Sequence, residues 1–118
     1  MTEINDFTVY YIVPKSKEAM DAWLPGMADS ENYEQYEINE RLNNTLWKLY
    51  DKFNQHFNII IDNCEDECLP YNCLLEALTI VNEYINDLCD NETKLVLKKL
   101  QMAINSAIKY RTCLFFDF

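Results

Sequence analysis

Residues 33–57, YEQYEINERLNNTLWKLYDKFNQHF, form the longest stretch with helical periodicity in this chain of 118 residues. Apolar side chains recur in it at steps of three or four residues, a spacing that places them on one face of an α-helix. These side chains are Ile38, Leu42, Leu46, Leu49, Phe53 and Phe57. We therefore expect a helix over about 33–57 to be the main element of the fold.

Two further helices are predicted downstream of an acidic loop at residues 62–69. Pro70 suits the first turn of a helix over about 70–89, because a backbone N–H would have no partner at that position. Residues 90–91, Asp-Asn, then interrupt the chain and cap a last helix over about 92–111. The wide apolar arc of this last helix indicates that it lies at the centre of the molecule.

The two ends of the chain carry short apolar segments that are typical of strands. Residues 7–13, Phe-Thr-Val-Tyr-Tyr-Ile-Val, are mostly β-branched or aromatic, and residues 112–118 end in Cys-Leu-Phe-Phe-Asp-Phe. An exposed terminus this apolar would be a liability, so we expect the two segments to pair. Ser16 is expected to cap a short helix after the first strand. The predicted fold is mainly α, with three to four helices packed as a small bundle and a minor two-stranded β element from the N- and C-terminal segments.

The length of the chain predicts one domain, residues 1–118. Glu3 and Asp6 lie where a signal peptide would carry basic side chains. No stretch approaches the roughly 20 apolar residues of a membrane span. Five cysteines in a chain without a leader are typical of reduced thiols in the cytoplasm. We therefore expect a cytoplasmic protein that does not bind membranes.

Charge is distributed unevenly along the chain, which has 20 acidic and 10 basic side chains and a net charge of −10. Residues 61–92 hold nine acids and no lysine or arginine. In the helix expected over about 70–89, four acids fall within about 60° of one another, opposite the apolar stripe. We call them the acidic ridge: Glu76, Glu83, Asp87 and Asp90. A helix selected only for stability would interleave basic residues, because like charges at helical spacing repel.

We expect the acidic ridge to bind a basic protein, and the alternative is a solvated face that keeps a small protein soluble. Acids of the preceding loop would extend the ridge at one end. Aromatic side chains flanked by acids also resemble the anchors of protein interfaces. The predicted partner-binding residues are Glu65, Asp66, Glu67, Tyr71, Glu76, Glu83, Tyr84, Asp87 and Asp90.

Composition argues against most catalytic, cofactor and metal sites. With Gly26 as its one glycine and His56 as its one histidine, the chain has no glycine-rich phosphate loop and few possible nucleophile–histidine pairs. Cys64, Cys68 and Cys73 lack the C-x2-C spacing of structural zinc sites, so loop thiols without a metal are favoured, and the sequence leaves a disulfide between two of the cysteines open. The acidic loop also lacks the glycine and glutamate that a calcium loop requires. We expect no enzyme activity, no cofactor, no metal and no direct binding of nucleic acid.

A short, acidic, aromatic-rich chain with an acidic run from Asp62 to Glu92 resembles the immunity proteins of bacterial toxin systems. These include the immunity proteins of nuclease bacteriocins and of contact-dependent growth inhibition. The resemblance implies a protein that binds a basic toxin domain, typically a nuclease, and blocks its active site or an adjacent substrate-binding surface. It implies no particular fold, because these families differ in architecture. The alternative is a phage-type inhibitor that imitates nucleic acid, as anti-restriction and anti-CRISPR proteins do.

Overall fold

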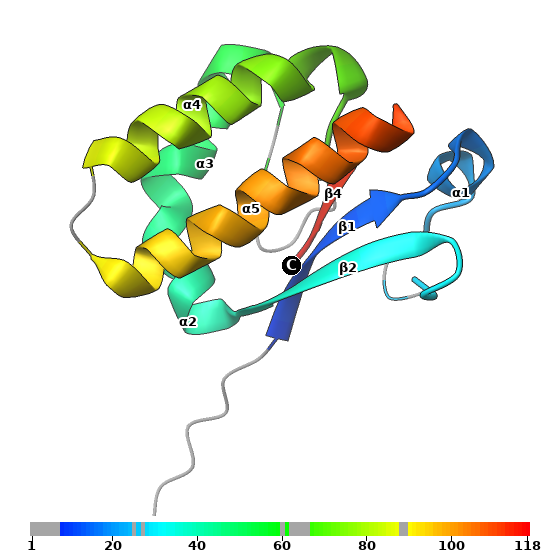
Figure 1. The fold of residues 1–118 in the computed structure, drawn as a ribbon, viewed down its shortest axis with the longest axis horizontal. Helices are drawn as coiled ribbons and strands as arrows, with labels where there is room; N and C mark the ends of the chain where they lie inside the picture. The colour runs from blue at the N-terminus through cyan, green and yellow to red at the C-terminus, as the bar shows by residue number, and fades with distance from the viewer. Residues whose placement is uncertain (1–7, 25, 27, 60, 62–66, 88–89) are drawn as a thin grey trace, which may run out of the picture.

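The computed structural model combines a four-stranded antiparallel sheet with helices packed mainly on one of its faces (Figure 1). The strands are β1 (Thr8–Pro14), β2 (Tyr33–Asn39), β3 (Glu67–Leu69) and β4 (Leu114–Asp117). Residues 8–118 are described here, except 25, 27, 60, 62–66 and 88–89.

The strands lie in the order β2-β1-β4-β3, so the two ends of the chain form the centre of the sheet. Tyr11 of β1 pairs with Phe116 of β4, and both side chains are completely buried. The predicted pairing of the two terminal segments is therefore confirmed. It follows from their composition, because the most apolar strands gain most from a central position.

The predicted mainly α bundle with a two-stranded element was wrong, because the sheet has four strands. Residues 33–39 form β2, whereas the sequence indicated the start of a helix there. β2 pairs with β1 along its whole length and so satisfies the backbone N–H and C=O groups on that edge of β1. Residues 67–69, predicted as loop, form β3 beside β4. Pairing with distant strands overrides local helical preference in both places.

The helices are α1 (Lys17–Asp21), α2 (Glu40–Asn43), α3 (Trp47–Phe57), α4 (Leu74–Asp87) and α5 (Asn91–Tyr110). Two 3-10 turns lead into longer helices, η1 (Asn44–Leu46) into α3 and η2 (Tyr71–Cys73) into α4. Asn39 ends β2 and begins the helical segment, because its side chain accepts a hydrogen bond from the backbone N–H of Arg41 at 2.8 Å. No described helix is long and apolar enough to cross a membrane.

The main core lies between the sheet and α3, α4 and α5. α5 runs between the sheet and α4 (Figure 1), with one face buried from Val96 to Ala107, as its wide apolar arc predicts. A buried hydrogen-bonded chain ties the sheet to the helices: Tyr11 and Tyr50 hydroxyls lie 2.6 Å apart, and Tyr50 donates to Asn43 Oδ1 at 2.5 Å.

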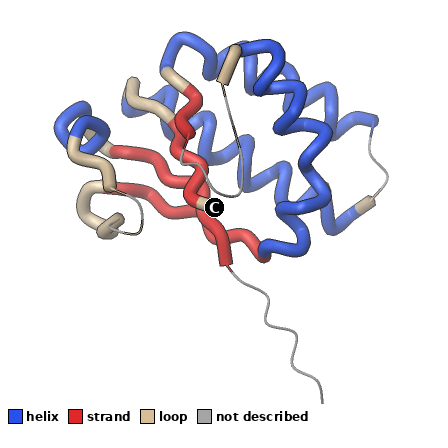
Figure 2. The backbone as a smooth tube through the Cα atoms, turned by 180° about the vertical axis from the view of Figure 1, so that it is seen from behind, coloured by secondary structure: helices blue, strands red, loops and turns tan. Residues whose placement is uncertain are grey.

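A smaller core covers the opposite face of the sheet beside α1. Ser16 caps α1 as predicted, since its hydroxyl accepts a hydrogen bond from Ala19 N–H at 3.0 Å. Trp23 stacks on Phe115 of β4, with ring centroids 5.0 Å apart. Figure 2 shows the sheet from behind, with the long helices gathered on one side and α1 set apart at one end.

Candidate functional site

α4 presents one buried face to the core and one exposed face to solvent. Leu74, Ala77 and Val81 are completely buried, which anchors the helix. The acids Glu76, Glu83 and Asp87 are all exposed on the other side. We call these three residues the α4 acidic face. The structure therefore places three of the four predicted ridge residues together on one rigid helix.

Asp90 lies outside the α4 acidic face, because α4 ends at Asp87 and Asp90 caps the next helix. Its carboxylate accepts hydrogen bonds from Thr93 Oγ1 at 2.5 Å and from Glu92 N–H at 3.3 Å. The hydrogen bond from Thr93 lowers the pKa of Asp90, because it stabilises the charged form. Asp90 thus has a structural role as the N-cap of α5, and the expected helix over 70–89 was too long.

The other predicted binding residues have different surroundings. Tyr71 in η2 is about half exposed, whereas Tyr84 of α4 packs partly against the main core. Glu67 begins β3 opposite Phe116, and Glu65 and Asp66 lie outside the described residues. Of these residues, only Tyr71 is an exposed aromatic side chain, and it lies in the turn that precedes α4.

Lysine and arginine do not form ion pairs with the α4 acidic face in the described part of the chain. The one such contact there joins Glu76 Oε2 to His56 Nε2 of α3 at 3.1 Å; it is an ion pair only when the imidazole is protonated, and both side chains are about half exposed. Lys48 and Lys52 are also exposed on α3 but form no ion pair with the described acids. Such exposed carboxylates remain available to a partner.

The exposure of a leucine beside these acids was not predicted from the sequence. Leu75 is 71% exposed and precedes Glu76 directly. Its signal was present in the helical spacing, because Leu75 lies about 100° away from the buried Leu74. Together with Tyr71, it supplies apolar surface at the N-terminal end of the α4 acidic face.

A single carboxylate, that of Glu34, joins β2 to α5 through hydroxyl groups, and this was not predicted from the sequence. Glu34 accepts hydrogen bonds from Tyr36 at 2.7 Å, from Tyr110 at 3.3 Å and from Ser106. Burial opposes ionisation of Glu34, but the three hydroxyl donors outweigh it and lower the pKa of this carboxyl. The residues that meet here lie more than 70 positions apart in the chain. The arrangement fastens the edge strand β2 to α5.

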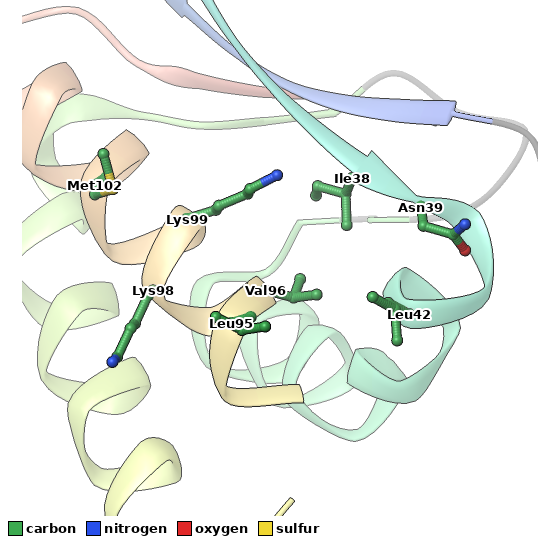
Figure 3. Close-up of a pocket in the computed structure, with 8 residues that line it drawn as sticks. All are labelled: Ile38, Asn39, Leu42, Leu95, Val96, Lys98, Lys99 and Met102. Atoms are coloured by element: carbon green, nitrogen blue, oxygen red, sulfur yellow. The ribbon is translucent and has the colours of Figure 1, made fainter. Parts of the chain in front are cut away.

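A groove of about 370 Å³ lies where α5 meets β2 and α2 (Figure 3). Its walls are mainly apolar, and Leu95 and Met102 are both more than half exposed. Lys99 points toward β2, where its ammonium group donates a hydrogen bond to the Glu37 carbonyl at 2.6 Å, while Lys98 points away (Figure 3). Because its lining has no carboxylate, thiol or imidazole, this groove offers contact surface without acid–base chemistry.

Within the described ranges, no three His, Cys, Asp or Glu side chains are grouped closely enough to hold a metal ion. Cys64 and Cys89, two of the five cysteines, lie outside those ranges.

Comparison with protein-family models, with curated proteins and with solved structures finds no match to this chain. The geometry and charge of the α4 acidic face are therefore the grounds on which a function is proposed.

Proposed function

We propose that this protein is an inhibitor that binds a basic protein through the α4 acidic face. The observation that carries the proposal is the exposure of three carboxylates on one helix, of which only Glu76 forms an ion pair within the described residues. α4 is anchored by buried side chains, so these charges keep fixed positions. Fixed surface charges steer an oppositely charged partner and raise its association rate.

Charge alone does not hold a complex together. The apolar side chains near the acids supply the second contribution to binding, which is apolar contact area. Tyr71 and Leu75 are exposed at the N-terminal end of the face. Partly exposed aromatic and apolar side chains of this kind gain most when a partner removes them from water. In the proposed complex, Tyr71 and Leu75 are the anchors, and Glu76, Glu83 and Asp87 set the orientation.

The partner that best fits this surface is a toxin nuclease, so the protein would be the cognate immunity protein. A nuclease carries basic residues where it contacts phosphates, and a row of carboxylates can occupy that surface. Rapid, electrostatically steered association suits a protein that must intercept a toxin. The proposal places the protein in the cytoplasm, where it blocks the nuclease active site or the adjacent substrate-binding surface.

The spacing of the three acids favours this function over imitation of nucleic acid. With a rise of about 1.5 Å per residue, Glu83 lies about 10 Å from Glu76 along the helix axis, and Asp87 lies about 6 Å further. Phosphates along a nucleic-acid strand are evenly spaced instead. The uneven spacing on α4 therefore matches a surface specific to one protein better than a copy of a DNA strand.

The proposal can be tested with two triple variants that change net charge equally. E76K/E83K/D87K reverses the α4 acidic face, and E18K/D21K/E31K reverses three exposed acids on and beside α1. Each variant and the wild-type protein are immobilised and exposed to extract from the source organism, and bound proteins are identified by mass spectrometry. We expect the wild type and the α1 variant to retain the same basic protein, and the α4 variant to lose it.

Association kinetics with that purified partner then measure how much the α4 acidic face contributes to the association rate. Reversal of the α4 acidic face should slow association by about tenfold or more at low salt, with a smaller difference at high salt. Inhibition of the partner's nuclease activity should weaken in parallel. Equal losses in both triple variants would show a dependence on net charge alone, and unchanged binding by the α4 variant would make the face a solubility surface. Circular dichroism of all three proteins establishes that they are folded.

A further inference from the structure

Two cysteine side chains meet on the face of the sheet that carries α1. Cys68 of β3 pairs with Phe115 of β4, and Cys113 lies two residues before Phe115. Residues related in this way across antiparallel strands are diagonal neighbours on one face of the sheet. The Cys113 thiol is hydrogen-bonded to Cys68, and both residues are in the thiol form.

These two cysteines line a pocket of about 370 Å³. Met20, Pro70, Tyr71 and Phe115 supply most of its apolar walls, and Arg111 stands at its edge. Arg111 is exposed, adopts a left-handed backbone conformation at the end of α5 and forms no ion pair with the described acids. The lining of the pocket therefore includes two adjacent sulfur atoms and one positively charged side chain without an ion pair to the described acids.

The two thiols differ in their surroundings, so each is suited to a different step of disulfide exchange. The hydrogen bond to Cys68, together with burial, holds the pKa of the Cys113 thiol far above its usual range. Cys113 is 3% exposed, whereas Cys68 is half-buried. The more accessible of two sulfurs meets an incoming disulfide first, because access is a condition of thiol–disulfide exchange. Cys68 is thus suited to attack first, with Cys113 placed to resolve the product.

We propose that this pocket is a thiol–disulfide exchange site for a small anionic disulfide of the oxidised-glutathione type. The carboxylates of such a molecule would bind Arg111, which places its S–S bond beside Cys68. The proposal shares Tyr71 with the proposed partner-binding surface, but it rests on the two cysteines and Arg111 and not on the acids of α4.

The exchange proceeds in two steps, in which atoms, protons and electrons balance. The Cys68 thiolate attacks one sulfur of the small disulfide, its S–S bond breaks, and one thiolate leaves as Cys68 forms a mixed disulfide. The Cys113 sulfur then attacks Cys68 sulfur, forms the Cys68–Cys113 disulfide and releases the second small thiolate. The protons of Cys68 and Cys113 end on the two released thiols. The protein pair is oxidised by two electrons, and the small disulfide is reduced by the same two electrons.

Formation of this bond would fasten β3 to the beginning of β4. β3 is three residues long and leads through Pro70 and η2 into α4. A covalent link at Cys68 therefore holds the segment that carries Tyr71, which itself lines the pocket. The redox state of the pair would set how firmly the start of α4 is attached to the sheet.

The test uses the reduced, full-length protein treated with oxidised glutathione, followed by alkylation, trypsin digestion and mass spectrometry. Cleavage after Lys52, Lys94 and Arg111 gives peptides 53–94 and 112–118, and only the second contains Cys113. We expect the wild type to yield these two peptides joined by a disulfide. C113S should stop at the first step, with one glutathionyl group on peptide 53–94. C73S, the matched control for the third described thiol, should cross-link like the wild type.

The role of Arg111 has a separate readout, the rate of the first step in C113S. R111Q in this background should slow reaction with oxidised glutathione several-fold and leave reaction with uncharged bis(2-hydroxyethyl) disulfide unchanged. A cross-link that persists in C68S, or that disappears in C73S, would assign the chemistry to other sulfurs and overturn the proposal. Absence of the cross-link in the folded wild type, or an equal effect of R111Q on both disulfides, would also overturn it.

Discussion

The α4 acidic face and Glu34 show two opposite ways in which this acidic protein uses carboxylates. Glu34 lies between β2 and α5, where hydroxyl groups of Tyr36, Ser106 and Tyr110 donate to it. The acids of α4 lie in solvent, and only Glu76 is ion-paired within the described residues. The fold thus satisfies the first carboxylate internally and leaves the others to interact with something outside the chain.

This difference in hydrogen bonding distinguishes an acid with a structural role from the acids that we propose bind a partner, which charge alone does not. A carboxylate that holds two elements together contributes to folding stability, whereas exposed like charges on one helix repel one another. If the α4 acidic face served stability, its acids would be interleaved with bases or bonded to neighbouring groups. Removing charge from the two regions should therefore change the stability of the protein by different amounts.

The largest difference is expected from one matched pair of neutralising substitutions. E34Q removes the charge that accepts three hydroxyl hydrogen bonds and should lower the free energy of unfolding by about 1–2 kcal/mol, since Glu34 is partly exposed. E83Q makes the same chemical change on α4 and should alter the free energy of unfolding by less than about 0.5 kcal/mol. Urea unfolding of both variants and the wild type measures the two effects. Equal effects would remove the distinction between the regions.

The contribution of Glu34 should also depend on pH. Its pKa is lowered in the folded protein relative to the ordinary glutamate value of 4.5. The stabilisation is therefore complete above this value and is lost as pH falls through the lowered folded value. The difference in unfolding free energy between wild type and E34Q should shrink as pH is lowered from 7 to below about 4. A difference that grows toward acid pH would contradict the hydrogen-bonded, ionised form of Glu34.

The smallest effect is a gain in stability from changing an acid of α4. Asp87 is the last residue of the helix, where a negative charge interacts unfavourably with the helix dipole, and it lies four residues after Glu83. D87K should raise the free energy of unfolding by about 0.3–1 kcal/mol. E76K at the first turn is the control and should lower it slightly, because an acid is favourable there. A loss of stability in D87K would indicate that Asp87 has an intramolecular role.

Helical periodicity identified the helices that bury one continuous apolar face. The stripe of α4 from Leu74 to Val81 and that of α5 from Val96 to Ala107 are buried as their spacing predicts. Asp90 was wrongly assigned to the acidic ridge, because it fits the helical spacing but acts as a cap. Helical spacing cannot distinguish these two positions, since a capping aspartate and an exposed helical aspartate differ only in the backbone that surrounds them.

The strands at the sheet edges could not be recognised in the same way. Along β2, successive side chains point to opposite faces of the sheet. Tyr36 and Ile38 pack on the main core on the α5 side, and Tyr33 packs near α1 on the other side. The polar residues Glu34, Gln35 and Glu37 of β2 mask this alternation, and the helical stripe beginning at Ile38 extended the predicted helix backward. β3 is too short to show any period. Both strands exist because a more apolar neighbour needs hydrogen-bonding partners.

The amino-acid order by itself determined which faces of α4 and α5 are apolar and where acids accumulate, because these properties depend only on residue spacing along a helix. It also determined that the two apolar ends of the chain pair. Only the tertiary structure decided that Glu34 is held by Ser106 and Tyr110, that Cys68 meets Cys113 and that Asp90 leaves the acidic ridge. These relations join residues through strand register and helix ends, which are fixed by long-range packing and backbone hydrogen bonding.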